Sequence, residues 1–341
     1  MRDASPPPLH DHIDGAGASG TQSGRKGIFV TVNASPTRSC ICYIANQGYL
    51  YQSLVSAIQA RQHSPAHWDV IVFDMTAVPG EESRRIAHVC AAKGVEYRWA
   101  DPAILGGLHI MNARLFLDEL LPADYVQILY LDGDTQVVGD LNPLLDFQPQ
   151  PGGLCAVRDP MIYLRGVDRL RGEFEDEIRA FGDDYVNSGV FRADRASWAT
   201  ISRKALAQMG NATSALHFED QTVINRVTTG RRNYASLRWN FPGFILGYGL
   251  DTIAPPAIVH FMSNPRPWQG AYAPWGRSWN IPYLALAREF PEIKEYCAAL
   301  DLRRRAAYKV KQIAKSYVER RLWNAPELLN HIRRLEDRAD V

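Results

Sequence analysis

A largely apolar run at residues 126–131 ends abruptly in Asp132-Gly133-Asp134. Such a run is typical of a strand that is buried on both faces of a parallel sheet. Upstream of it, β-like and helix-like stretches alternate. The β-like stretches are residues 28–33, 39–46, 70–73 and 95–98, and the helix-like ones are 49–62, 81–93 and 109–120. This alternation predicts an α/β fold with a mostly parallel central sheet and helices on its faces.

The pattern after residue 138 is looser and predicts shorter elements. Strands are expected at residues 154–157 and 188–191, helices at 194–209 and 220–227, and Pro- and Trp-rich loops at 238–280. No internal repeat or long linker divides the chain. We therefore expect a flexible leader at 1–26, one Rossmann-like catalytic domain at 27–280, and a helical, basic C-terminal extension at 281–341.

Cysteine use and charge bound the setting in which the chain works. Its five cysteines are odd in number and form no C-x-x-C pair, which favours a reducing compartment. Residues 1–26 have no apolar core and do not read as a signal peptide, and no run approaches the roughly 18 apolar residues that span a bilayer. Residues 303–321 hold eight basic residues and one acidic, although the whole chain carries only +1. The expected location is cytoplasmic, with no nucleic-acid partner.

Asp132 and Asp134 are the first candidates for chemistry. In open α/β sheets, ligands bind beyond the carboxyl ends of the strands, where this pair lies. Two carboxylates separated by one small residue can converge on Mg²⁺ or Mn²⁺, and such a cation neutralises a leaving diphosphate. Alone, an Asp-Gly-Asp sequence is also a common surface turn.

The segment from Tyr130 to Val138 resembles the metal-binding strand of the family 8 retaining glycosyltransferases, which include bacterial lipopolysaccharide galactosyl- and glucosyltransferases and the glycogenins. Further segments match in the family's order. They are Ile44-Ala45-Asn46-Gln47-Gly48-Tyr49, Asn112-Ala113-Arg114-Leu115, Val186-Asn187-Ser188-Gly189-Val190, Asp220-Gln221, and His260-Phe261 with Arg266-Pro267-Trp268. The resemblance implies a GT-A type nucleotide-diphospho-sugar transferase fold.

Roles for individual residues follow from this resemblance. The metal ligands would be Asp132, Asp134 and His260; Mn²⁺ suits a nitrogen ligand better than Mg²⁺, which is the alternative. Contacts to the UDP-sugar would come from Ala45, Asn46, Tyr49, Arg114, Asp132, Gly133, Asp134, Ser263 and Arg266. The transferred sugar would lie among Asp159, Asn187, Asp220 and Gln221, whose short polar side chains suit sugar hydroxyls.

The implied reaction moves a hexose, galactose or glucose, from a UDP-hexose to a saccharide or glycolipid acceptor with retained anomeric configuration. The chain departs from the family at Arg266, where Lys is usual, at Ser263, where Gly is common, and at Thr222, where some members carry Asp. Since Thr222 removes one carboxylate, attack from the face that UDP leaves is favoured, with Asp220 as the fallback nucleophile.

Three points stay open at this level. The chain could be a catalytically inactive UDP-sugar or carbohydrate-binding protein; a sugar-nucleotide pyrophosphorylase is disfavoured because residues 28–49 hold no Gly-rich phosphate loop. Trp268, Trp275 and Trp279 are either an acceptor platform or loop anchors. At 303–321, Ala306, Val310, Ile313 and Tyr317 recur at helical spacing among basic residues, which predicts a helix on the inner face of an anionic membrane or one packed on the domain.

Overall fold

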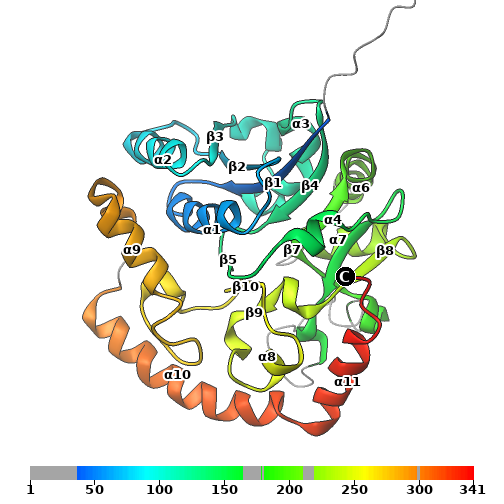
Figure 1. The fold of residues 1–341 in the computed structure, drawn as a ribbon, viewed down its shortest axis with the longest axis vertical. Helices are drawn as coiled ribbons and strands as arrows, with labels where there is room; N and C mark the ends of the chain where they lie inside the picture. The colour runs from blue at the N-terminus through cyan, green and yellow to red at the C-terminus, as the bar shows by residue number, and fades with distance from the viewer. Residues whose placement is uncertain (1–36, 164–177, 179, 210–218, 298–299) are drawn as a thin grey trace, which may run out of the picture. The chain divides into compact units, whose positions relative to one another are not determined.

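The larger of two sheets has the strand order β3-β2-β1-β4-β7-β6-β8 (Figure 1). This computed structural model describes residues 37–163, 178, 180–209, 219–297 and 300–341, so the predicted leader and the predicted strand at 28–33 lie outside the described residues. The strands of this sheet are β1 (Arg38–Ala45), β2 (Trp68–Asp74), β3 (Glu96–Trp99), β4 (Tyr125–Leu131), β6 (Leu154–Arg158), β7 (Val186–Asp194) and β8 (Arg232–Ala235). Only β7 runs antiparallel to its neighbours, so the sheet is mostly parallel, as predicted.

Alternate side chains of β1 face two separate cores, because successive residues of a strand point to opposite sides of the sheet. Ile41, Tyr43 and Ala45 pack with α1 (Leu50–Gln62) and α2 (Glu81–Ala92). Cys40, Cys42 and Ile44 pack with α3 (Leu117–Leu120), α6 (Arg195–Met209) and α7 (Glu219–Val227). Helices therefore cover both faces, which explains why β1 from Cys40 onwards and β4 apart from Gln127 are apolar on both sides of the strand.

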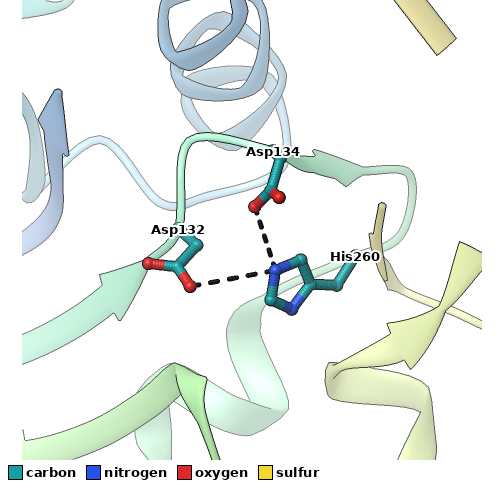
Figure 2. Close-up of side chains that lie close together, drawn as sticks. All are labelled: Asp132, Asp134 and His260. Atoms are coloured by element: carbon teal, nitrogen blue, oxygen red, sulfur yellow. Dashed lines mark ion pairs between the residues drawn. The ribbon is translucent and has the colours of Figure 1, made fainter. Parts of the chain in front are cut away.

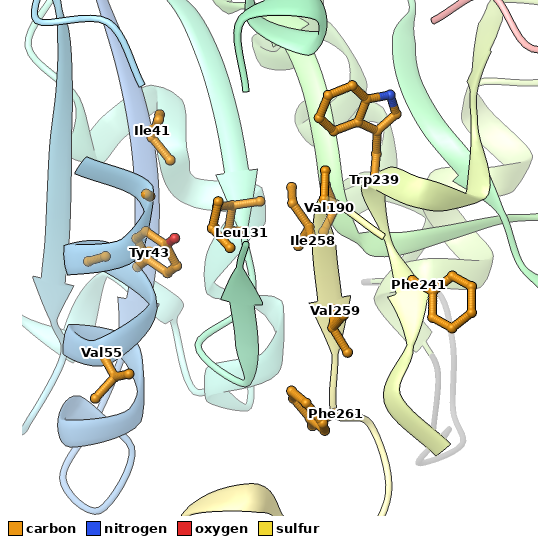
Figure 3. Close-up of a cluster of buried hydrophobic side chains, with 14 of the residues drawn as sticks. Ile41, Tyr43, Val55, Leu131, Val190, Trp239, Phe241, Ile258, Val259 and Phe261 are labelled. Atoms are coloured by element: carbon orange, nitrogen blue, oxygen red, sulfur yellow. The ribbon is translucent and has the colours of Figure 1, made fainter. Parts of the chain in front are cut away.

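Two strands of a second, three-stranded sheet lie where loops were predicted at 238–280. Its order is β5 (Thr135–Val137), β10 (Ile258–His260) and β9 (Phe241–Pro242). The same hydrophobic core joins it to the large sheet: Figure 3 shows Ile41 and Tyr43 on one side, Leu131 between, and Val259 and Phe241 beyond. The loop prediction was wrong here because strands of two or three residues are too short to show a hydrophobic period.

Residues 109–120 were predicted as one helix, and this was wrong in type. The structure has a 3-10 helix at Ile110–Phe116 followed by the single turn α3. Residues 112–117 are all buried, since the segment runs between the sheet and the helices α6 and α7. Because polar and apolar side chains are buried alike at 112–117, the pattern marks no single packed face and cannot specify how tightly the segment winds.

The C-terminal residues pack on the same core as the sheets. α9 (Ile281–Glu289) lies on α1, where the Tyr51 hydroxyl donates to the Tyr283 carbonyl at 2.5 Å. α10 (Leu302–Trp323) ends at the fully buried Trp323, and α11 (Pro326–Glu336) contributes Ile332 and Leu335 to the core. The described residues also form two short helices, α4 (Asn142–Asp146) and α8 (Leu250–Ile253). Among the described residues, no helix combines the length and apolarity needed to cross a bilayer.

The packed side of α10 is not the side that the sequence pattern singled out. Tyr308, Gln312 and Trp323 face the protein, whereas Val310, Ile313 and Tyr317 are 71%, 59% and 64% exposed. α10 is thus a docked helix whose outer surface carries apolar side chains among lysines and arginines.

Candidate active site

Hydrogen bonds to main-chain groups hold the loop that follows β4 in place. The Asp132 N–H donates to the Gly189 carbonyl on β7 at 2.8 Å, and the Thr135 hydroxyl donates to the Asp132 carbonyl at 2.8 Å. Gly133 lies so close to α1 that an added Cβ would be 2.1 Å from Ser53 Oγ. A larger residue between the two aspartates would have to displace the Ser53 hydroxyl.

The small sheet brings His260 to this loop. His260 pairs with Thr135 across the β5–β10 ladder, one residue beyond Asp134. Its Nε2 lies 2.9 Å from Asp134 Oδ1 and 3.8 Å from Asp132 Oδ2 (Figure 2). The three side chains each offer one ligand atom, and these atoms all lie within 4.8 Å of one another. The structure therefore brings the three predicted ligands close enough together to hold a divalent cation.

The space beside this cluster is open because residue 189 is a glycine and has no side chain. A Cβ on Gly189 would lie 2.4 Å from His260 Cε1 and 2.7 Å from Asp132 Oδ2. Oxygen and imidazole donors of this kind suit a first-row divalent metal such as Mn²⁺. Both the donor set and the clearance provided by Gly189 therefore fit a bound cation.

Two arginines flank the carboxylates. Arg114 lies 3.1 Å from Asp132 and 3.1 Å from Asp220, and its guanidinium donates to the Ser188 carbonyl at 2.7 Å. Arg266 forms an ion pair with Asp134. Both arginines that were predicted to contact the UDP-sugar thus reach the cluster.

The pKa values in the cluster follow from burial and from these charges. Burial acts to raise the pKa of Asp134, but His260 and Arg266 outweigh it and hold that pKa below its usual range. Burial raises the pKa of Asp132 against the opposing effects of Arg114 and His260. Burial acts to lower the pKa of His260, but the Asp134 carboxylate outweighs it and the pKa is raised.

The residues predicted to hold the transferred sugar form one buried group beside the cluster. Asp159 Oδ2 accepts from Asn187 Nδ2 at 3.2 Å and from Gln221 Nε2 at 3.1 Å, and Gln221 Oε1 accepts from the Ser188 N–H at 3.2 Å. Asp220 lies on the other side of Arg114. The structure thus gathers all four.

The residues predicted to hold the nucleotide line the next strand end. Ala45 ends β1, and the Asn46 carbonyl accepts from the Tyr49 N–H at 2.9 Å. Tyr49 is 43% exposed, and its ring meets the edge of Trp268 at 6.2 Å between centroids. Ser263 is half-buried in the loop after β10.

The three tryptophans of the 268–279 loop are anchors. Trp268 and Trp275 are buried, and Trp279 packs against the same core beside Phe261. Trp268 and Trp275 therefore present no exposed face to an acceptor, whereas Trp279 is only partly buried.

Sequence reasoning missed Asn240. It is buried next to His260, and its Oδ1 lies 2.9 Å from His260 Nδ1. The signal was its place between Trp239 and Phe241, because a polar side chain inside an apolar segment needs buried hydrogen-bond partners.

Comparison with known proteins places these features in a family. The model of glycosyl transferase family 8 matches residues 40–271, more than half of the chain. The lipopolysaccharide 1,2-glucosyltransferase of Escherichia coli (strain K12) is 26% identical over 204 residues, 56% of this chain and 54% of the relative. Glycosyltransferase GlyF of Streptococcus pneumoniae serotype 4 (strain ATCC BAA-334 / TIGR4) is 27% identical over 176 residues, 48% of this chain and 39% of the relative. The chain thus spans about half the length of the first relative and about two fifths of the second.

Solved structures share the fold. The galactosyltransferase LgtC, in complex with donor and acceptor sugar analogs, superposes with a TM-score of 0.57 at 22% identity, covering 72% of this chain and 95% of LgtC. The glycosyltransferase GlyE of Streptococcus pneumoniae TIGR4 has a TM-score of 0.53 at 20% identity, covering 82% of this chain and 64% of GlyE. The predicted GT-A type α/β fold is confirmed.

Proposed function

Because the chain belongs to glycosyl transferase family 8, we propose that it transfers a hexose from a UDP-hexose to a saccharide or glycolipid acceptor with retained anomeric configuration. The observation that carries the proposal is the cluster of Asp132, Asp134 and His260, flanked by Arg114 and Arg266 at the strand ends. Relatives named as a lipopolysaccharide glucosyltransferase and a galactosyltransferase support glucose or galactose as the sugar.

Asp132, Asp134 and His260 would hold Mn²⁺, with Mg²⁺ as the second choice because it prefers oxygen ligands. The bound cation supplies positive charge that stabilises the leaving diphosphate. Arg114 and Arg266 can fork onto phosphate oxygens of the same group and lower the energy of the charge that develops there. The exposed ring of Tyr49 offers a stacking face to uracil.

The sugar-side residues support attack from the face that UDP leaves. Both the oxygen and the nitrogen of the Gln221 side-chain amide are hydrogen-bonded. An amide is also a poor nucleophile. Asp220, the fallback nucleophile, lies 3.1 Å from Arg114, and a positive charge at that distance reduces its nucleophilicity. In this mechanism a phosphate oxygen of the leaving UDP takes the acceptor's proton, while Asp159 and Asn187 orient the sugar hydroxyls.

A panel of UDP-sugars incubated with Mn²⁺ tests the proposal. We expect Mn²⁺-dependent release of UDP from one UDP-hexose, and an NMR time course should show an α-linked donor giving an α-anomeric sugar. An inverted product would exclude retention. Mn²⁺-dependent UDP binding without turnover of any donor would identify the alternative, an inactive UDP-sugar-binding protein.

The domain assignment and the membrane contact also remain proposals. We assign residues 27–280 to catalysis and 281–341 to a helical extension that meets the cytoplasmic face of an anionic membrane. The exposed Val310, Ile313 and Tyr317 among basic residues support it, since such a face combines apolar insertion with attraction to anionic lipid. An acceptor carried on a lipid would then be brought to the enzyme.

Point substitutions test this contact better than deletion of 303–341, which would expose the core around the buried Trp323, Ile332 and Leu335. We expect the full chain to sediment with phosphatidylglycerol-containing vesicles at low salt and to be released by added salt. Val310→Glu combined with Ile313→Glu should abolish sedimentation. The control, Leu284→Glu on α9, alters an exposed leucine outside α10 and should not. Equal sedimentation of all three would leave α10 a purely structural helix.

A further inference from the structure

A chain of buried amides connects His260 to the sugar-side residues. Asn240 Oδ1 lies 2.9 Å from His260 Nδ1, and Asn240 Nδ2 donates to Asn187 Oδ1 at 2.8 Å. Asn187 Nδ2 in turn donates to Asp159 Oδ2 at 3.2 Å. Asn240 is 2% exposed and His260 4%, so water does not compete freely for these contacts.

The orientation of both side-chain amides in this hydrogen-bonded series is set by neighbouring groups that can only donate or only accept a hydrogen bond. The Gly189 N–H can only donate, and it donates to Asn187 Oδ1 at 2.9 Å. The Asn187 amide must then turn its Nδ2 towards the Asp159 carboxylate, an acceptor. Asn240 has to present Nδ2 to Asn187 Oδ1, which leaves its Oδ1 for the imidazole. A carbonyl oxygen accepts only, so His260 Nδ1 carries the hydrogen.

Strand pairing places Asn240 for this task. β9 follows it directly and runs parallel to β10, with Pro242 opposite His260. The backbone of Asn240 is anchored by its own N–H, which donates to the Leu237 carbonyl at 3.1 Å. The pairing of β9 with β10 and the bond from the Asn240 N–H therefore fix the backbone on both sides of the contact between Asn240 and His260.

We propose that Asn240 is a positioning residue that holds His260 as the Nδ1–H tautomer, presents Nε2 to the divalent cation, and links that metal ligand to Asn187 and Asp159. The inference rests on the proposed function, because it assumes that the cluster binds a cation. A hydrogen bond to the far nitrogen of a metal-bound histidine fixes the ring's tautomer and orientation, and its loss typically weakens metal binding about 10- to 100-fold.

The substitutions Asn240→Ala and Asn240→Asp separate the two contacts of this side chain. Alanine loses both, whereas aspartate still accepts from His260 Nδ1 but cannot donate to Asn187. Asn233→Ala is the control; Asn233 lies on β8, and its Oδ1 accepts from the Gln150 N–H at 2.8 Å. The readout is the dissociation constant for Mn²⁺ alone, from the EPR signal of free Mn²⁺, on the full chain.

We expect Asn240→Ala to weaken Mn²⁺ binding about 10-fold and Asn240→Asp to restore it to near the wild-type value. Asn240→Asp should still show a raised KM for the UDP-hexose, because Asn187 has lost its donor. Unchanged Mn²⁺ affinity in Asn240→Ala, beside a wild type that binds Mn²⁺, would overturn the inference alone. A wild type that binds no Mn²⁺ would overturn the metal assignment and the inference with it.

A measurement on the unmodified protein covers the case in which Asn240→Ala fails to fold. Zn²⁺ accepts the same kinds of ligand and is diamagnetic, so the ring ¹⁵N shifts of His260 can be recorded in the Zn²⁺-loaded chain. We expect a protonated Nδ1 and a metal-bound Nε2. The reverse assignment would overturn the role given to Asn240.

Discussion

The carboxylate half of the metal cluster and its imidazole half are held by different forces. Asp132 and Asp134 lie beside Arg114 and Arg266, so charge balances charge. His260 also faces Asp134 through Nε2, but its far nitrogen, Nδ1, is held by the neutral amide of Asn240. Charge acts over several ångströms and tolerates small displacements, whereas a hydrogen bond to one ring nitrogen fixes direction. We therefore expect the carboxylates to set how strongly the cation is held and His260 to set where it is held.

The largest effect should come from removing a carboxylate. Asp132→Ala or Asp134→Ala should lower the rate of transfer at saturating Mn²⁺ by about 1,000-fold or more, since several kcal/mol of charge stabilisation depend on the cation. Steady-state assays of UDP release measure this. Asp140→Ala, an exposed neighbour that caps the Asn142 N–H, should leave the rate unchanged. Near-normal rates in both site variants would end the metal assignment.

Removing the imidazole should cost less. His260→Ala leaves both carboxylates and the donor's diphosphate to hold the cation, so we expect Mn²⁺ affinity to fall about 100-fold, beyond the effect of losing Asn240. Titration of Mn²⁺ by EPR or calorimetry measures it. If affinity is unaffected, His260 is a core residue that happens to lie beside Asp134.

A substitution that displaces His260 and a carboxylate without removing either should lower Mn²⁺ affinity less than the loss of His260. In Gly189→Ala the new Cβ would press on His260 and Asp132 together, and we expect Mn²⁺ affinity to fall on the order of 10-fold. Gly80→Ala is the matched control, because a Cβ added there would meet no atom within 4 Å and the φ of Gly80 is −107°. Equal affinities in the two variants would show that the cluster is loose enough to absorb a methyl group.

The smallest expected effect is on the pH dependence of the stabilisation that Mn²⁺ gives to the folded protein. The pKa of His260 is raised in the folded state, so its stabilising contribution is present below the unfolded value of about 6.5 and is lost as pH rises through the folded pKa. Mn²⁺ displaces that proton. The stabilisation by Mn²⁺ should therefore grow as pH rises through this window, as thermal unfolding with and without Mn²⁺ would show. His260→Ala should remove the trend.

The two halves also differed in how well the sequence predicted them. Strands β1, β2 and β4 carry strong local patterns, so the large sheet and the position of Asp132 and Asp134 beyond β4 could be predicted from the residues. The second sheet could not, because β9 and β10 are two and three residues long and depend on tertiary contacts for their existence. His260 was located through resemblance to a family, and Asn240 was missed altogether.

The two edge strands of the large sheet determine whether copies of this protein can aggregate by strand pairing. An unpaired edge strand is a template for pairing with another molecule. β3 has only four residues, two of them charged, and is a poor template. Along β8, the Tyr234 carbonyl accepts from the Asp340 N–H at 2.7 Å, and the Ser236 N–H donates to the Val341 carbonyl at 2.7 Å. Residues 340–341 thus occupy hydrogen-bonding groups that a second sheet would need.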